Sequence, residues 1–316
     1  MLSLLAYTPI HLDKKAEQGP GVGDVDIRGV CHIPQSYLPQ PLLDLNKLFT
    51  KQFIDNGHEI INADGFLVNT FDALEPVALA ALRDGYCKVI PGFPPVYAIG
   101  PLRSQHNSPK VEKEEATSSP IAWLDRQPAR SVVYVVFGNR NAMSYDQIRE
   151  IADRLEASGC LYLWVLKTTM VDRDDSVELT DMLGKGFLER VQGRGLVTKA
   201  WVDQETLLKH PSMGLFLSHS RWNSVMEAAA FGVTLLAWPH GGDHHVNATV
   251  VVSGGVGLWM EHWSGDGEDW LVIGEEIENK VKEVMSDAAI RARVMRTGEE
   301  AAKAIAEGGT SYRSMQ

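Results

Sequence analysis

The side chains best suited to chemistry follow an apolar run that ends at Ser218. His219 and Asn223 lie in the turn after this run, and a helix is expected to begin near Ser224. Asn and Ser cap helices well and the first amides of a helix are free, so such a junction can bind an anion such as a diphosphate. His219 can donate to a phosphate oxygen, and Glu227, one turn into the helix, can accept from ribose hydroxyls. The pattern is also typical of a capped helix with a packed histidine.

A second polar loop follows the next apolar run, Val233–Trp238. Gly241 and Gly242 let the backbone approach a ligand closely, and Asp243 and His244 then offer hydrogen-bonding groups to hydroxyls.

Three histidines in this loop, His240, His244 and His245, have a spacing that could suggest a metal ion. Two of them are adjacent and no further ligand is evident, so the pattern favours no metal site.

A third turn, residues 137–144, joins a strand to a helix through Gly138 and Asn139 and suits a phosphate contact. Gly19–Gly23 is a weaker signal still, and it does not indicate a dinucleotide fingerprint because no strand precedes it. The sequence contains no nucleophile elbow and no Walker loop, which argues against a serine hydrolase or a P-loop enzyme.

These loops are expected at one edge of a parallel sheet. From Ser131 onward, short apolar runs alternate with helical patterns, which predicts βαβ units and a Rossmann-like domain. Ligands of such folds bind at the carboxyl ends of the strands. Strands are expected at 131–137, 161–166, 195–200, 213–218, 233–238 and 256–260, and helices at 145–157, 224–230, 246–252 and, as a pair, from 274 to about 307.

The first 102 residues read as part of another domain. Strands are expected at 65–71 and 96–100 with a helix from 72 to about 83, but residues 10–41 are rich in Gly and Pro and weakly periodic. One or two strands cannot bury both faces of a doubly wound sheet. We therefore predict a partial N-terminal domain over 1–102, a polar linker over 103–120 and a C-terminal domain over 121–316.

Composition narrows the class of protein. Lys and Arg total 30 against 41 for Asp and Glu, and a net charge of -11 argues against nucleic-acid binding. The cysteines Cys31, Cys87 and Cys160 lack disulfide or zinc spacing, which fits a reducing compartment. The apolar start, residues 1–7, is much shorter than the roughly 20 residues of a membrane span. The sequence thus predicts a cytoplasmic protein without stable membrane insertion.

Taken together, the motifs resemble the donor box of the plant family 1 UDP-glycosyltransferases, in register from Trp201 to His244. The flanking sequence resembles the flavonoid C-glycosyltransferases of grasses, which act on 2-hydroxyflavanones, over essentially the whole chain. The residues that carry the resemblance are Trp201–Gln204, His210, His219, Trp222–Ser224, Glu227, Trp238, Pro239 and Asp243, with support from Asn69–Pro76, Ser131–Val135 and Gly195–Gln204.

The resemblance implies an α/β fold of the GT-B type with two Rossmann-like domains, the N-terminal one incomplete. It also implies that Trp201 stacks on uracil, that Gln204 lies near the uridine and that Glu227 binds the ribose. His219, Asn223 and Ser224 would hold the diphosphate, and Asp243 with His244 would bind the sugar. Val202, Trp222 and Asn139 complete the donor-binding residues that the resemblance implies.

The chain departs from the family pattern at several positions. Ser220 and Arg221 stand where the family has Cys-Gly, so that Arg221 either adds a phosphate contact or crowds a turn built for glycine. Thr234 replaces a proline and Asn139 a serine. His244 stands where family members that use UDP-glucose have Gln. The donor is therefore expected to be UDP-glucose, with UDP-galactose as the alternative.

The family's catalytic His and its Asp partner fall upstream of the position that aligns with Met1, so we assign no catalytic residue here. In the family that His deprotonates a phenol whose ring carbon displaces UDP. The leading hypothesis is a UDP-glycosyltransferase that transfers a hexose to a flavonoid or related phenol, with C-glycosylation favoured and no cofactor. A catalytically silent UDP-sugar-binding fragment is the alternative. A Rossmann oxidoreductase is a third, which the missing glycine fingerprint disfavours.

Overall fold

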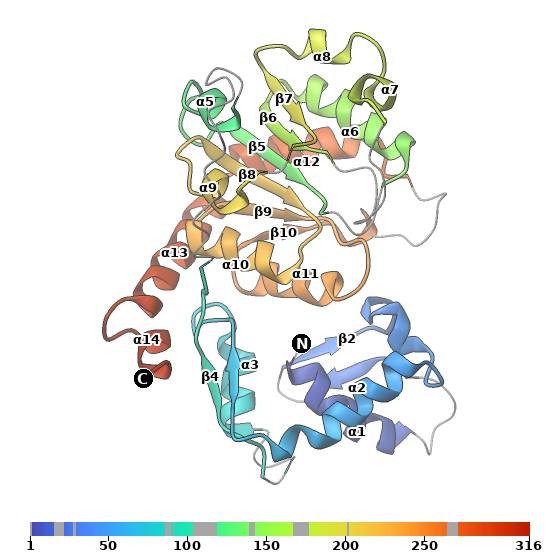
Figure 1. Ribbon diagram of the computed structural model, residues 1–316, viewed down its shortest axis with the longest axis vertical. Coiled ribbons are helices and arrows are strands. Elements are labelled where there is room, and N and C mark those ends of the chain that lie inside the picture. The colour runs from blue at the N-terminus through green and yellow to red at the C-terminus, as the bar shows by residue number, and fades with distance from the viewer. Residues whose placement is uncertain are drawn as a thin grey trace.

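The computed structural model describes residues 2–15, 22–27, 30–85, 90, 92–103, 119–138, 143–166, 177–200, 202–263 and 271–316. Two parts stand out in Figure 1: a larger one built on a six-stranded sheet, and a smaller one formed by the N-terminal segment. No helix of the described residues is long and apolar enough to cross a membrane.

The large sheet is parallel throughout and has the strand order β10-β9-β8-β5-β6-β7. From β5 the chain continues to β6 and β7 on one side of the sheet, and from β8 it continues to β9 and β10 on the other side. The topological switch point therefore lies between β5 and β8. Ligands of open α/β sheets bind at such a point. The strands are β5 (Val132–Val136), β6 (Leu161–Val165), β7 (Gly195–Thr198), β8 (Met213–Ser218), β9 (Thr234–Ala237) and β10 (Gly257–Trp259).

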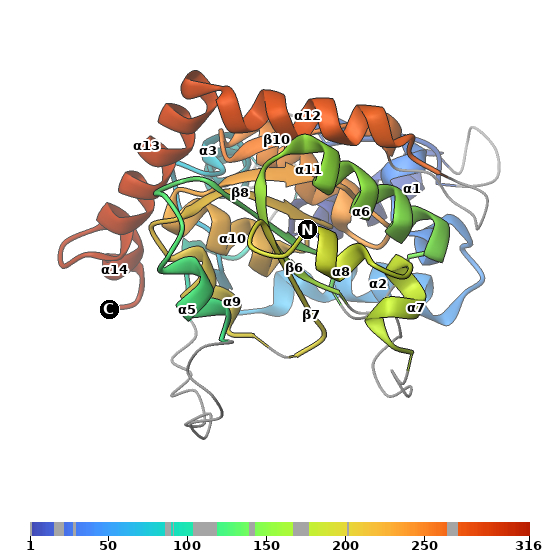
Figure 2. The ribbon, with the colours of Figure 1, turned by 90° about the horizontal axis from the view of Figure 1, so that it is seen from above.

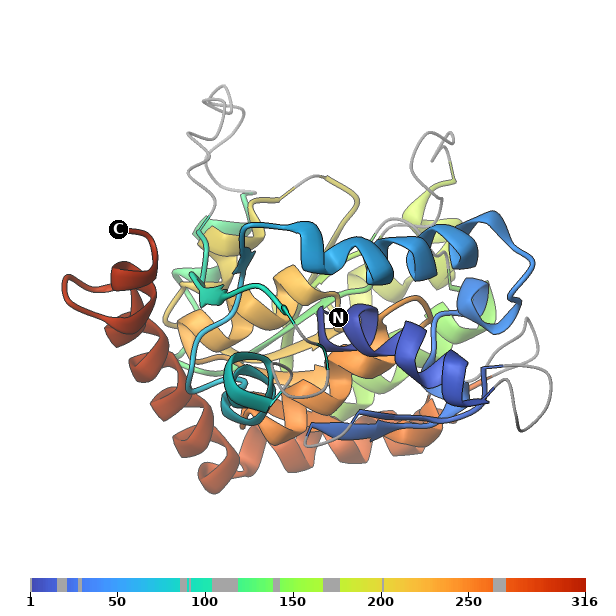
Figure 3. The same ribbon diagram turned by 90° about the horizontal axis from the view of Figure 1, so that it is seen from below.

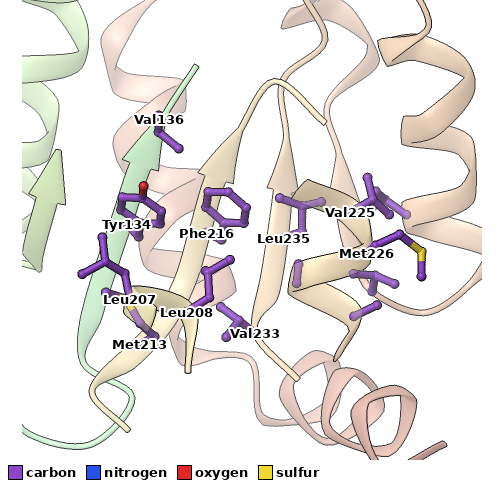
Figure 4. Close-up of a cluster of buried hydrophobic side chains, with 14 of the residues drawn as sticks. Tyr134, Val136, Leu207, Leu208, Met213, Phe216, Val225, Met226, Val233 and Leu235 are labelled. Atoms are coloured by element: carbon purple, nitrogen blue, oxygen red, sulfur yellow. The ribbon is translucent and has the colours of Figure 1, made fainter. Parts of the chain in front are cut away.

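The central strands are apolar on both faces because helices cover both. Alternate side chains of a strand point to opposite faces, so Tyr134 and Val133 enter different hydrophobic clusters. Figure 4 shows Tyr134, Phe216 and Leu235 on neighbouring strands of one face. The rings of Tyr134 and Phe216 stack there with centroids 5.1 Å apart. This double burial explains why continuous apolar runs predicted these strands.

Helices α6 (Tyr145–Ser158) and α12 (Gly274–Ser286) pack together on one face of the sheet (Figure 2). Ser144 caps α6 and Gly159 ends it in a left-handed conformation. The other face carries α9 (Gln204–Leu208), α10 (Trp222–Phe231), α11 (His244–Ser253) and α13 (Ala288–Ile305). Shorter helices are α5 (Pro120–Leu124), α7 (Leu179–Leu183), α8 (Phe187–Arg190) and α14 (Thr310–Ser314).

The N-terminal segment is more regular than its sequence predicts. It contains α1 (Leu2–Lys15), an antiparallel pair of β1 (Val25–Ile27) and β2 (Cys31–Ile33), α2 (Leu48–Glu59), α3 (Pro76–Ala80), and a parallel pair of β3 (Phe66–Val68) and β4 (Val96–Ala98). The sequence pattern did not predict α1, α2 or the β1–β2 pair. It also extended the strands at 65–71 and 96–100 too far and began the helix before Pro76.

Close packing of α1 on α2, seen in Figure 3, explains one of these omissions. Gly57 is buried inside α2, and a Cβ added there would lie 2.6 Å from the carbonyl oxygen of Leu5 in α1. A glycine inside a helix lowers local helix propensity. Gly57 is needed here because α1 and α2 approach each other closely at this position. Sequence periodicity does not reveal such a contact.

The two parts are joined by specific contacts. The indole Nε1 of Trp222 in α10 donates to the carbonyl of Asn69 at 2.8 Å. Helix α14 packs against β4, and the buried Ser311 hydroxyl donates to the carbonyl of Gly100 at 2.6 Å. Most of the predicted linker, residues 104–118, lies outside the described residues, and the description resumes at Ser119, the cap of α5.

Candidate functional site

A cavity of about 260 Å³ lies beyond the carboxyl ends of β5, β8 and β9. These ends are level with one another, because Val136 pairs with Ser218 and Ser218 pairs with Ala237. Residues directly after these three strands therefore line one cavity at the switch point of the sheet, as the sequence predicts. The cavity is lined by Phe137, His219, Arg221, His240, Gly241, Gly242, Asp243 and His244.

His219 lines this cavity and is buried. Its Nδ1 lies 3.2 Å from the hydroxyl of Ser218, and its ring meets that of His244 edge to face at 4.8 Å. Burial, followed by the charges of His244, His240 and Arg221, lowers the pKa of His219 to about 3. The imidazole is therefore neutral near pH 7 and acts as a hydrogen-bonding group without charge.

Gly138 permits this placement of His219. It has a φ of +77°, and a Cβ at this position would lie 2.7 Å from Nε2 of His219. Any other residue would therefore meet both backbone strain and a collision with the imidazole. The sequence singled out Gly138 because it lies in a strand-to-helix turn. In the structure this glycine is needed because it lies against His219.

His240 and His244 bring two more neutral rings to the cavity. His240 packs almost flat on Trp238 at 5.9 Å, with an interplanar angle of 20°. Burial lowers its pKa to about 3, and burial also lowers the pKa of His244 to about 4, with Asp243 opposing and Arg221 adding. The backbone amide of His240 donates to Nδ1 of His244 at 3.4 Å, which leaves Nε2 of His244 as a donor.

The turn after β8 has an unusual backbone at Ser220, where φ is +59°. Its hydroxyl donates to the carbonyls of His219 at 2.7 Å and His244 at 3.1 Å, and its own carbonyl accepts from Nδ2 of Asn247 at 3.1 Å. Arg221, the residue before α10, has an ordinary extended φ of -62°. The left-handed conformation therefore falls on Ser220, and the backbone of Arg221 requires no glycine.

Asp243 is held by the same network. Its Oδ2 accepts from Nδ2 of Asn247 at 3.0 Å, one turn along α11. Asn247 thus ties the turn after β8 to the loop after β9 and fixes two walls of the cavity.

Gln204, Ser224 and Glu227 form a second polar group beside α10. Nε2 of Gln204 donates to Oε2 of Glu227 at 2.5 Å and lies 3.3 Å from the hydroxyl of Ser224. Burial raises the pKa of Glu227, while the bond from Gln204 opposes the shift. The structure therefore brings these three predicted residues together where the start of α9 meets α10, and none of them lines the cavity.

The remaining predicted residues have different surroundings. Trp222 lines two apolar cavities of about 190 and 340 Å³ between the N-terminal segment and α11, and its bond to Asn69 joins the two parts. Asn223 is exposed and Val202 packs against the core. Trp201 and Asn139 lie outside the described residues.

The histidine spacing indicated His240 only as a candidate metal ligand, so the predicted donor site did not include it. Its position two residues after Trp238, close to the end of β9, was the available signal. Within the described ranges, no three His, Cys, Asp or Glu side chains come together in a group that could hold a metal ion.

Comparisons with known proteins show which family the chain resembles. The family described as "UDP-glucoronosyl and UDP-glucosyl transferase" matches residues 92–299. The "UDP-glycosyltransferase CGT" of Oryza sativa is 55% identical over 315 residues, covering 100% of this chain and 66% of its own length. The "UDP-glycosyltransferase 708A6" of Zea mays is 52% identical over 319 residues, with the same two shares. The chain thus spans about two thirds of the length of these relatives.

Solved structures show the same fold. That of LpCGTa in complex with UDP has a TM-score of 0.82 and 43% identity, covering 100% of this chain and 65% of its own. That of UGT71G1 from Medicago truncatula, complexed with UDP-glucose, has a TM-score of 0.82 and 29% identity, covering 99% and 67%. The predicted α/β fold of the GT-B type is confirmed.

Proposed function

Because this chain belongs to the UDP-glucoronosyl and UDP-glucosyl transferase family, we propose that it binds a UDP-sugar in the cavity beyond β5, β8 and β9. The observation that carries this proposal is the meeting of His219, Arg221 and His244 at the switch point, next to the first turn of α10. No side chain of the described residues caps that helix, and an uncapped helix N-terminus favours an anion.

Each part of the donor has a matching group. The diphosphate would lie on the N-terminus of α10 beside His219, and the ribose hydroxyls would reach Glu227, whose carboxylate is already oriented by Gln204. The sugar would then face Asp243 and His244. Two similar solved structures contain UDP or UDP-glucose, which supports a UDP-sugar as the ligand.

The reaction that we propose is transfer of a hexose, with glucose favoured over galactose, to a flavonoid or related phenol. An ionised phenol attacks the anomeric carbon through an ortho ring carbon, and a C–C bond forms. The bond between the anomeric carbon and the β-phosphate oxygen breaks, and UDP leaves with the electron pair. The ring carbon then loses its proton to restore aromaticity. We assign the initial base to no residue of this chain.

C-linkage is favoured over O-linkage because the relatives at 55% and 43% identity carry the names CGT and LpCGTa. We also propose a cytoplasmic location, on the spacing of the cysteines, and a reaction without a metal or organic cofactor.

Two measurements on the purified chain test the proposal. Calorimetry with UDP, and with ADP as the control nucleotide, tests donor recognition. Incubation with UDP-glucose or UDP-galactose and either phloretin or a 2-hydroxyflavanone, followed by mass spectrometry, tests transfer. Acid-stable glycoside with the mass of one added hexose supports C-transfer. Binding of UDP without product supports a silent donor-binding protein, and failure to bind UDP contradicts the donor site itself.

A further inference from the structure

Arg221 brings a positive charge to the wall of the cavity. Its side chain lines the cavity together with His219, Asp243 and His244. Its charge lowers the pKa of both His219, in the turn after β8, and His244, at the start of α11. The side chain of Arg221 therefore borders the same cavity as these two histidines.

Among the described residues, Arg221 makes no ion pair with a carboxylate within 4.0 Å. Asp243, the carboxylate nearest in the cavity wall, instead accepts from Asn247. A guanidinium always carries its charge, so an arginine in a cavity without a carboxylate partner favours an anionic ligand.

His240 gives a second, independent indication of a ligand. Its Nε2 is buried and has no hydrogen-bond partner among the residues that the structure describes. Buried polar atoms nearly always have a partner, so such an atom in a cavity wall points to a group that arrives with a ligand. His240 lines the same cavity as Arg221.

We propose that Arg221 contacts the β-phosphate of the bound UDP-sugar and stabilises the negative charge that this phosphate gains as the sugar leaves. The inference rests on the proposed function and adds a residue to it. When the bond between the anomeric carbon and the β-phosphate oxygen breaks, the electron pair stays on that oxygen. A guanidinium directed at it stabilises the transition state more than the ground state, where less charge is present.

The alternative, in which Arg221 crowds the turn, does not fit the backbone. Arg221 has a φ of -62°, in the extended region that every residue adopts, and Ser220 takes the left-handed position instead. The side chain leaves the turn toward the cavity, so it adds a contact without distorting the turn.

The test compares UDP with UMP, because only UDP has a β-phosphate. Calorimetry is carried out at 50 and 200 mM NaCl on the wild-type chain and on Arg221→Gln, which keeps the side-chain length but removes the charge. We expect Arg221→Gln to weaken UDP binding by about 10- to 100-fold, and to change UMP binding by less than about two-fold. The affinity for UDP should also fall less steeply with salt in the variant.

Two further variants serve as controls. Arg194→Gln removes a charge near the amino end of β6, on the opposite edge of the sheet, and should bind UDP like the wild type. Arg221→Lys keeps the charge and should recover part of the lost UDP affinity. If Arg221→Gln unfolds at the temperature of the assay, the UDP-to-UMP affinity ratio of Arg221→Lys still tests the proposal.

Equal binding of UDP by Arg221→Gln and the wild type would overturn the inference, and so would a loss that is equally large for UMP. Tighter UDP binding by Arg221→Gln would restore the crowding explanation. Failure of the wild-type chain to bind UDP at all would instead contradict the proposed function, so the two failures are distinguishable.

Discussion

Replacement of Gly138 by alanine is expected to damage the donor site through a single added methyl group. The new Cβ would lie 2.7 Å from Nε2 and 2.9 Å from Cε1 of His219. Ordinary contacts between such atoms begin near 3.5 Å, so the imidazole would have to move by most of an ångström. It is buried and packs on the His244 ring at 4.8 Å, so this movement would disturb a second wall of the cavity.

The cost has two parts. Gly138 has a φ of +77°, and a left-handed conformation costs a residue with a Cβ roughly 1–2 kcal/mol. Overpacking of a buried site adds about 1–3 kcal/mol. We therefore expect Gly138→Ala to lower the free energy of unfolding by about 2–5 kcal/mol.

Gly159→Ala is the matched control. Gly159 has a φ of +68° at the end of α6, and no described atom lies within 4 Å of the added Cβ. This variant should therefore show only the backbone cost of about 1–2 kcal/mol. The difference between the two variants isolates the contact with His219.

Urea unfolding measures the stability of both variants, and calorimetry with UDP measures the donor site. Gly138→Ala should bind UDP at least about 10-fold more weakly, which corresponds to the loss of one hydrogen bond to a charged group. Gly159→Ala should bind it normally. Equal destabilisation of the two variants together with unchanged UDP affinity in Gly138→Ala would refute the placement of His219 in the donor site.

Four other outcomes follow from the site. Because the pKa of His219 falls from 6.5 to about 3 on folding, the unfolded chain binds more protons between these values and stability is lost as pH falls below 6.5. Wild-type chain should lose roughly 2 kcal/mol from this group by pH 5, and His219→Gln should lose correspondingly less. Glu227→Gln should narrow the preference for UDP over 2′-deoxy-UDP, measured by calorimetry. Trp222→Phe should cost about 1 kcal/mol in urea unfolding through the lost bond to Asn69, without weakening UDP binding. Trp201→Ala should abolish measurable UDP binding.

Each of these expectations can fail separately. Identical acid sensitivity of wild type and His219→Gln would show that the histidine does not remain neutral. An unchanged nucleotide preference in Glu227→Gln would remove the ribose assignment. Loss of UDP affinity in Trp222→Phe would place the indole in the donor site rather than between the two parts, and unchanged affinity in Trp201→Ala would remove the stacking assignment.

The sequence predicted the larger part of the fold well because its strands are buried on both faces. A run such as Val132–Val136 has few other stable arrangements, and polar loops after β8 and β9 then mark the carboxyl edge. In the N-terminal segment the pattern was weaker. Helix α1 contains Pro9, and α2 contains a buried Gly57 that suits its contact with α1 but lowers helix propensity.

The sequence predicted those site residues whose place is set by where they follow a strand. His219, Asp243 and His244 follow strand ends, and the structure places all three around one cavity. What the sequence left open depends on single torsion angles and ring orientations. Whether Ser220 or Arg221 takes the left-handed conformation decides the role of Arg221, and the flat packing of His240 on Trp238 decides where its ring lies.

The electrostatics of the cavity explain why Arg221 matters there. His219, His240 and His244 have pKa values lowered to about 3, 3 and 4, so near pH 7 they offer hydrogen bonds but no charge. Among the described residues at this cavity, positive potential for a diphosphate comes from the α10 terminus and from Arg221, and neither depends on pH in this range. Arg221 also helps to keep His219 and His244 neutral. A permanent charge beside neutral donors is a suitable environment for a leaving group whose charge grows during the reaction.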